Sequence, residues 1–326
     1  MTKTVAVVIV NWNSWPLLAR CLQALAAQTF QDFSVTIIDN ASEAGPSEHL
    51  LAAYPSACLV RSPTNIGFAA ANNLAVRHHT GHSPWVALLN PDAFAQADWL
   101  AQLMQAANAH PDVAVFASRQ LNAADPSLLD GDGDRYHISG RAWRSGYGLP
   151  LAQQQNAHSG KPGSLPAVFS PCGAAALYRR SAYIEVGGLD EDFFCYFEDV
   201  DLGFRLQLAG YPCLLVPGAV VHHVGSATAG GQHGDFAVYH GHRNLVWTYF
   251  KNMPSALFWL FLPLHLALNL LTLLRYRHRI GVVWRAKKDA LLGLPRMLAK
   301  RQRIQARRRA STAAVWRILS KRLPPL

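Results

Sequence analysis

Cysteine is scarce in this sequence, and its spacing does not suggest metal binding. The 326 residues include five cysteines, and no two of them form a Cys-x-x-Cys pair. An odd number without such a pair argues against a disulfide framework and against a zinc ribbon. The first apolar run, residues 5–10, is too short for a signal peptide and lacks a small-residue cleavage site. The sequence therefore favours a protein of the reducing cytoplasm.

Glycine-rich nucleotide-binding motifs are missing as well. No Gly-x-Gly-x-x-Gly follows the first apolar run, and the chain has no Gly-Lys-Ser/Thr loop. These absences argue against a dinucleotide-binding fold and a P-loop enzyme. A nucleotidyltransferase is a weaker alternative, because residues 12–15 offer no Gly-rich loop with Lys or Arg that could hold a triphosphate.

Acidic residues are nearly absent from the C-terminal end. Residues 275–326 contain sixteen Lys or Arg and one acid, so this segment carries 16 − 1 = +15. The whole chain carries +10, which leaves 10 − 15 = −5 for residues 1–274. An acidic body with a basic tail predicts acidic partners for the tail, such as phosphates or anionic lipid. No recognised base-reading module accompanies the basic run 301–309, so we expect no nucleic acid partner.

Short apolar runs alternate with helical patterns over residues 4–117. Half of the residues in the chain are apolar, which is enough to build a sizeable core. The alternation predicts an α/β fold with a mostly parallel sheet and helices on both faces. The strand ends should then form one rim, where such folds bind ligands. The expected strands are residues 5–10, 35–38, 58–60, 85–89 and 113–116.

The pattern breaks down over residues 120–163, which are rich in Gly, Asp, Ser and Gln. We expect a long loop here, and loops of this length are usually functional or mobile. The acids Asp130, Asp132 and Asp134 have the spacing of a calcium loop. The bidentate Glu that such a loop needs is absent, so calcium is disfavoured.

Residues 256–274 carry no charge and are long enough to span a bilayer. Pro263 interrupts the run, and one helix face carries a polar stripe of His265, Asn269 and Thr272. Basic residues follow from Arg275 onward. This combination favours a helix in the membrane interface, while a true span and a buried core helix stay open.

Three carboxylates are crowded into four residues at Glu198, Asp199 and Asp201, just before a segment with helical spacing. Such crowding favours a carboxylate with a pKa suited to taking a proton. The same acids could instead stabilise a helix N-terminus. A second acidic turn, Asn90-Pro91-Asp92, follows the apolar run 85–89, at the kind of strand end where ligand chemistry is found.

Together with residues 10–13, 38–42 and 65–73, these segments resemble the inverting GT-A glycosyltransferases, and within them the rhamnosyltransferase-like enzymes of bacterial surface polysaccharide synthesis. The resemblance covers residues 4 to about 250. It implies a GT-A catalytic domain over residues 1–250. Residues 251–326 would form an apolar helix and basic helical tail associated with the membrane.

The expected cation site centres on Asp92. Glycosyl transfer must neutralise a departing diphosphate, and Mg²⁺ or Mn²⁺ held by a carboxylate does so. Asn90 replaces the first acid of the family's Asp-x-Asp pattern, and Asp92 could alternatively cap the following helix. The resemblance implies that His223, with His222 as second choice, completes the metal site. A purely structural role for either histidine stays open.

For the acceptor, the resemblance singles out Asp199 as the catalytic base, with Glu198 beside it. Glu198 or Asp201 could instead orient the acceptor or an arginine such as Arg205. The resemblance further implies that the segment around Asp132 closes as a lid over the donor.

The nucleotide pocket should lie at the first rim turns. Asp39 can accept the imide proton of uracil or thymine, and a helix N-terminus near residue 67 suits ribose or phosphate. All of these residues could instead be local turn caps. The proposed nucleotide-sugar contacts, in addition to Asp92, are Asn11, Asn13, Asp39, Asn65, Gly67 and Asn72.

The resulting hypothesis is an inverting transfer of a hexose, with L-rhamnose from a dTDP-linked donor as first choice and a UDP-linked donor as second. The acceptor would be a lipid-linked glycan, and the enzyme would be peripheral at the cytoplasmic face of the membrane. A catalytically inactive membrane- or nucleic-acid-binding protein is the remaining alternative. The sequence predicts no oligomeric state.

Overall fold

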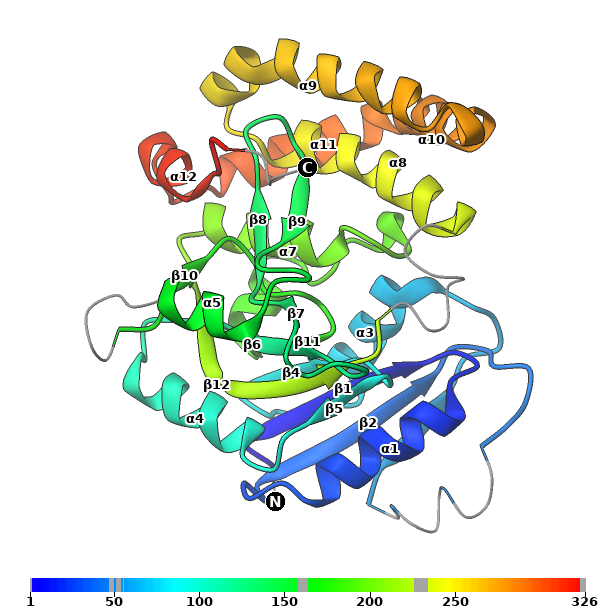
Figure 1. Ribbon diagram of the computed structural model, residues 1–326, viewed down its shortest axis with the longest axis vertical. Coiled ribbons are helices and arrows are strands. Elements are labelled where there is room, and N and C mark those ends of the chain that lie inside the picture. The colour runs from blue at the N-terminus through cyan, green and yellow to red at the C-terminus, as the bar shows by residue number, and fades with distance from the viewer. Residues whose placement is uncertain are drawn as a thin grey trace.

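The computed structural model describes residues 2–46, 50, 54, 56–157, 164–225 and 234–322. In this part of the chain a twisted sheet occupies one end of the molecule, and a group of helices occupies the other (Figure 1). A small hairpin, β8 with β9, lies between the two ends.

The sheet is mostly parallel, which confirms the predicted α/β class. Its strands lie in the order β10-β12-β6-β11-β4-β1-β2-β3, with β5 paired to β12 and β7 paired to β6. Strand β11 runs antiparallel between β4 and β6. The strands are β1 (Val5–Asn11), β2 (Phe33–Asp39), β3 (Cys58–Arg61), β4 (Trp85–Leu89), β5 (Ala93–Ala95), β6 (Val115–Asn122), β7 (Leu129–Gly131), β8 (Asp134–Tyr136), β9 (Ala142–Arg144), β10 (Ala167–Val168), β11 (Ala175–Arg179) and β12 (Cys213–His223).

Helices cover both faces of the sheet, because successive side chains of a buried strand point to opposite faces. In β1, Val7 and Ile9 pack with α1 and α4. Val8 and Val10 pack with α3, α6 and α7 on the other face. The helices are α1 (Trp15–Ala26), α3 (Gly67–His78), α4 (Trp99–Ala109), α5 (Leu151–Ala157), α6 (Arg180–Glu185), α7 (Glu198–Leu208), α8 (Asp235–Asn252), α9 (Ser255–Arg275), α10 (Ile280–Leu292), α11 (Leu294–Ala306) and α12 (Thr312–Ile318), with short 3₁₀ turns η1 (Glu191–Phe193) and η2 (Arg277–Arg279).

The expectation of one long loop over residues 120–163 is wrong in part. This segment contains β7, which pairs with β6, the hairpin of β8 and β9, and α5. Each of the three strands has only three residues, too few to show a period in the sequence. Residues 158–163 lie outside the described residues. The role of this segment as a lid stays a prediction.

The C-terminal helices pack against the part of the chain before residue 250. Val315 and Leu319 share a buried cluster with Tyr136 and Phe204. The backbone N–H of Ser320, after α12, donates to the carbonyl of Tyr136 at the end of β8 at 2.8 Å. The division at residue 250 stays a prediction, but the helices beyond it share a core with residues before it.

Helix α9 presents its polar stripe to the protein and its apolar side outward. His265 is buried, its ring stacks on Tyr249 with centroids 4.0 Å apart, and its Nδ1 lies 2.8 Å from the Ser139 carbonyl oxygen. Asn269 contacts His265 and accepts a hydrogen bond from Lys287. The helix is long and apolar enough to cross a membrane, yet only 17% of its most apolar stretch is buried. A buried core helix, one of the three expectations, therefore does not describe it.

Candidate active site

A cleft of about 460 Å³ opens at the carboxyl ends of β1 and β4, where the sequence predicted the rim of the sheet. Residues 194–200, at the start of α7, form the facing wall. Strand β9 and residues 172–174 complete the lining. The cleft gathers six of the predicted site residues: Asn65, Gly67, Asp92, Glu198, Asp199 and His223.

Asp92 and His223 meet at one side of this cleft. Asp92 Oδ1 lies 3.3 Å from Nε2 of His223, and the backbone N–H of Val224 donates to the carbonyl of Asp92 at 3.0 Å. Strand β5 begins directly after Asp92 and pairs Ala93 with His223, which holds Asp92 and His223 side by side. His222, the second choice, points to Gln96 instead, with Nε2 at 3.3 Å.

Asp130 contacts the ring nitrogen of His223 that faces away from Asp92. Its Oδ2 lies 2.7 Å from His223 Nδ1, and both side chains are buried. Burial lowers the pKa of His223, but its contacts with Asp130 and Asp92 outweigh burial and raise it. Burial acts in the opposite sense on Asp92, whose pKa is nevertheless lowered by its contact with His223.

The donor set at Asp92 and His223 fits a divalent cation. Nε2 of His223 is buried, has no hydrogen-bond partner, and faces the Asp92 carboxylate. A carboxylate that fixes the far nitrogen of a metal-binding histidine, as Asp130 does here, is the usual support for such a ligand. Among the described residues no three His, Cys, Asp or Glu side chains converge as a closed metal site, so further ligands would come from substrate or water.

Asp199 faces the cleft from the first turn of α7. Its Oδ2 accepts a hydrogen bond from the N–H of Gly173 at 2.8 Å, and its Oδ1 accepts one from the N–H of Val200 at 2.8 Å. Burial raises the pKa of Asp199, although these backbone bonds lower it. The carboxylate is thus positioned rigidly and is more basic than an ordinary aspartate, as a general base should be.

The turn that delivers Asp199 is strained. Phe194, Tyr196 and Phe197 have φ values of 64°, 65° and 69°, a region that bulky residues rarely adopt. Asn244 of α8, fully buried, places its Nδ2 within 3.0 Å of the carbonyl oxygens of Phe193, Cys195 and Tyr196. Nothing in the sequence marks Asn244, because its partners lie about fifty residues earlier.

Two further carboxyl groups share the cleft with Asp199. Burial and the charge of Asp199 raise the pKa of Glu198 well above its ordinary value, and its Oε2 has no hydrogen-bond partner. Asp134 of β8 also has a strongly raised pKa, from burial and then from Asp199, and accepts a hydrogen bond from Ser170. In the sequence, Asp134 stands out only as the third acid of a calcium-loop pattern that lacks its bidentate Glu.

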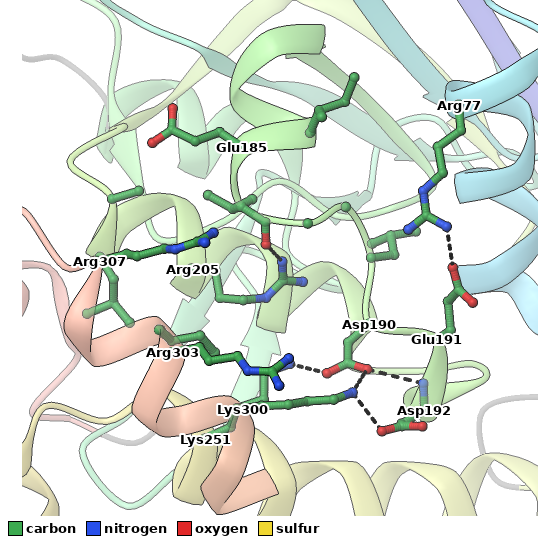
Figure 2. Close-up of a pocket in the computed structure, with 18 residues that line it drawn as sticks. Arg77, Glu185, Asp190, Glu191, Asp192, Arg205, Lys251, Lys300, Arg303 and Arg307 are labelled. Carbon is green, nitrogen blue, oxygen red and sulfur yellow. Dashed lines mark hydrogen bonds and ion pairs between the residues drawn. The ribbon is translucent and has the colours of Figure 1, made fainter. Parts of the chain in front are cut away.

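Three expected acceptor or lid residues do not line this cleft, and their part in acceptor binding or closure stays a prediction. Asp201 is fully buried and binds Arg205 Nη2 at 2.7 Å and Lys251 Nζ at 2.7 Å. Arg205 lines a different hollow of about 660 Å³ between α7 and α11, where its Nη1 donates to the carbonyl of Val186 at 2.7 Å (Figure 2). Asp132 is buried against Arg119, with Oδ2 to Nη2 at 2.8 Å. Each is held in an ion pair, and the pair of Asp201 with Arg205 matches the alternative in which Asp201 orients that arginine.

The remaining nucleotide candidates brace the rim. Asn11 Nδ2 donates to Ser42 Oγ at 3.3 Å, and Asp39 Oδ1 accepts from the N–H of Ser42 at 3.1 Å. Asn13 Oδ1 accepts from the N–H of Glu43 at 2.9 Å. Asn72 donates within its own helix, to the carbonyl of residue 68 at 2.9 Å. None of these four lines the cleft, and their contact with a nucleotide stays a prediction.

The sheet and cleft define an α/β enzyme of the GT-A type. The sequence profile of "Glycosyl transferase family 2" matches residues 6–187, and that of "Glycosyl transferase family group 2" matches residues 155–298. The chain belongs to glycosyl transferase family 2 and is a rhamnosyltransferase-like glycosyltransferase. The predicted family and enzyme class are confirmed.

Among its relatives is an N-acetylglucosaminyl-diphospho-decaprenol L-rhamnosyltransferase of Mycobacterium tuberculosis, 31% identical over 264 residues, covering 74% of this chain and 82% of the relative. A galactofuranosyltransferase of the same organism, GlfT1, is 29% identical over 69% of this chain and 72% of its own length.

Two solved structures share the fold. GalNAc-T7 with UDP, GalNAc and Mn²⁺ superposes with a TM-score of 0.59 at 17% identity, over 78% of this chain and 48% of its own. This chain therefore spans about half of the length of GalNAc-T7. A mannosyltransferase from Pyrobaculum calidifontis in complex with GDP-Man and Mn²⁺ gives a TM-score of 0.54 at 17% identity, over 97% of this chain and 78% of its own.

Proposed function

We propose that this chain transfers a hexose from a nucleotide diphosphate sugar to a lipid-linked glycan with inversion, and that the sugar is L-rhamnose from a dTDP-linked donor. The observation that carries this proposal is the shared cleft, which has Asp199 on one wall and the Asp92–His223 pair on another. The name of the 31% identical relative supports the sugar and the lipid-linked acceptor.

In the proposed reaction Asp199 takes the proton of the acceptor hydroxyl, whose oxygen attacks the anomeric carbon as the bond to the diphosphate breaks. The acceptor oxygen attacks from the face opposite the diphosphate, so this single displacement inverts the configuration of the anomeric carbon. The hydrogen bonds from Gly173 and Val200 keep the carboxylate oriented, and the raised pKa strengthens it as a base.

Asp92 and His223 would hold Mg²⁺ or Mn²⁺, which would neutralise charge on the leaving diphosphate. Asp130 would keep His223 oriented with Nε2 available. Both solved structures named above were obtained with Mn²⁺, which supports a divalent cation as cofactor.

We further propose that α9 and α10 attach the enzyme to the cytoplasmic membrane face as a peripheral protein. Trp259, Leu270 and Trp284 are 70%, 62% and 64% exposed, an unusual display of large apolar side chains. Because the middle of α9 is bound to the body through His265, the helix is suited to lie in the membrane plane rather than to cross it. Arginines at its C-terminal end would meet anionic headgroups.

The purified full chain should be assayed with dTDP-rhamnose and with UDP-linked sugars, using a short-prenyl diphospho-N-acetylglucosamine as acceptor. We expect turnover with the dTDP-linked donor, and a loss of about 10²-fold or more in Asp199→Asn with donor binding retained. Asp112→Asn, at an exposed position that does not line the cleft, is the matched control. Full activity of Asp199→Asn would refute the base, and turnover of UDP-linked donors alone would refute the donor.

A further inference from the structure

The cleft is rich in carboxyl groups, although the proposed donor carries a negatively charged diphosphate. Its lining includes four carboxyl groups, from Asp92, Asp134, Glu198 and Asp199. The diphosphate of a donor would add further negative charge to this carboxyl-rich site. Among the lining residues in the described chain, Arg144 is the one lysine or arginine.

Arg144 lies next to the Asp130–His223 pair at the end of β9. It ends β9, and its guanidinium forms an ion pair with Asp130, the same carboxylate that holds His223. Asp134 lies opposite it in the hairpin register and also lines the cleft. The side chain remains 23% exposed, so a ligand in the cleft can reach it.

Building on the function proposed above, we propose that Arg144 binds the diphosphate of the nucleotide-sugar donor. Its planar guanidinium offers paired N–H donors to two phosphate oxygens, which an ammonium group cannot match. Its position next to the Asp130–His223 pair places it beside the proposed cation, so the two positive groups would share the diphosphate charge. In the absence of ligand, Asp130 keeps the guanidinium in place.

The proposal predicts a selective loss of diphosphate affinity. Titration calorimetry should compare dTDP with thymidine on the wild-type full chain, Arg144→Gln and Arg144→Lys. We expect dTDP to bind Arg144→Gln at least about tenfold more weakly, as for loss of a charge-assisted hydrogen bond, with thymidine unchanged. Arg144→Lys should recover part of the affinity. Arg135→Gln removes an exposed arginine from the same hairpin and should change neither ligand.

Each titration should be repeated with EDTA and with Mn²⁺, because Arg144 also braces Asp130. A direct contact predicts that the loss persists in EDTA. A loss of dTDP affinity seen only with Mn²⁺, together with weaker binding of Mn²⁺ alone, would mean that Arg144 acts through His223 and would overturn the proposal. Equal dTDP affinity of Arg144→Gln and wild type would overturn it too, and so would a defect confined to the prenyl-diphosphate acceptor. If the wild type binds no nucleoside diphosphate, the proposed function itself fails.

Discussion

Replacing Lys251 with methionine is expected to destabilise the catalytic domain as a whole. Lys251 lies on α8 with its side chain 1% exposed, and its Nζ is 2.5 Å from Asp190 and 2.7 Å from Asp201. Burial lowers the pKa of this lysine, and Asp201 and Asp190 partly oppose that effect. Asp201 lies on α7 two residues after Asp199, so this ion network fixes the helix that presents the proposed base.

The magnitude follows from which charges lose a partner. Removing one member of a buried ion pair typically costs about 3–5 kcal/mol, because the other charge stays buried without compensation. Here Asp201 would keep Arg205 and Asn252, and Asp190 would keep Lys300 of α11. We therefore expect a loss near the lower end, about 3 kcal/mol in the free energy of unfolding.

Urea unfolding followed by tryptophan fluorescence would measure this change, since Trp247 lies on the same helix. Lys3→Met is the matched control, because Lys3 pairs with Asp32 at 3.6 Å on the surface, where ion pairs often contribute nothing measurable. A midpoint for Lys251→Met equal to that of Lys3→Met would refute the reasoning.

The effect should also depend on pH. Burial raises the pKa of Asp190, but Lys251 and Lys300 outweigh it and hold the pKa well below its ordinary value. A depressed folded-state pKa gives stability that is fully present above the unfolded-state pKa, about 4, and is lost as the pH falls below it. The difference between wild type and Lys251→Met should therefore be largest near neutral pH and shrink below about pH 4.

The proposed base and cation can be tested separately from stability. Burial raises the pKa of Asp199, and a base must be deprotonated to act, so kcat/KM should rise with pH above the range in which an ordinary aspartate titrates. Asp199→Asn should lack this pH dependence. Asp92→Ala should abolish activity and its stimulation by Mn²⁺, and EDTA should inactivate the wild type reversibly; full activity in chelator would contradict the cation site. Trp259→Asp should weaken co-sedimentation with anionic vesicles, since it puts a charge on the apolar side of α9, whereas Leu149→Asp should not. Vesicle binding unaffected by Trp259→Asp would contradict the membrane proposal.

The fold was largely predictable because its central strands are buried on both faces. All five expected runs overlap strands of the sheet, and the polar turns after β1, β2 and β4 lie on its carboxyl edge, as the parallel arrangement requires. The segment over residues 120–163 was not predictable, since each of its strands β7, β8 and β9 has three residues and is too short to show an alternating pattern. Its charged side chains, Asp130 and Arg144 among them, could not be assigned without the pairing of these strands.

The acid cluster shows where motif reasoning stops. Glu198, Asp199 and Asp201 are close in sequence, but successive helical residues turn by about 100° around the axis. Asp199 and Asp201 consequently point in different directions, the first into the cleft and the second into the ion network with Lys251. From their sequence positions the three acids would be placed in one site, whereas the helix directs Asp199 and Asp201 into different surroundings.

The hairpin of β8 and β9 joins the exposed apolar helix to the cleft. At its tip the Ser139 carbonyl lies 2.8 Å from His265 Nδ1, and Gly140 has a φ of 91° with no room for a side chain against His265. At its base, Asp134 and Arg144 line the cleft. The strands between these two ends are only three residues long, so the contact with α9 and the cleft lie close together along the hairpin. An enzyme whose acceptor is anchored in lipid would thus have its proposed diphosphate contact on a hairpin whose tip touches the proposed membrane helix.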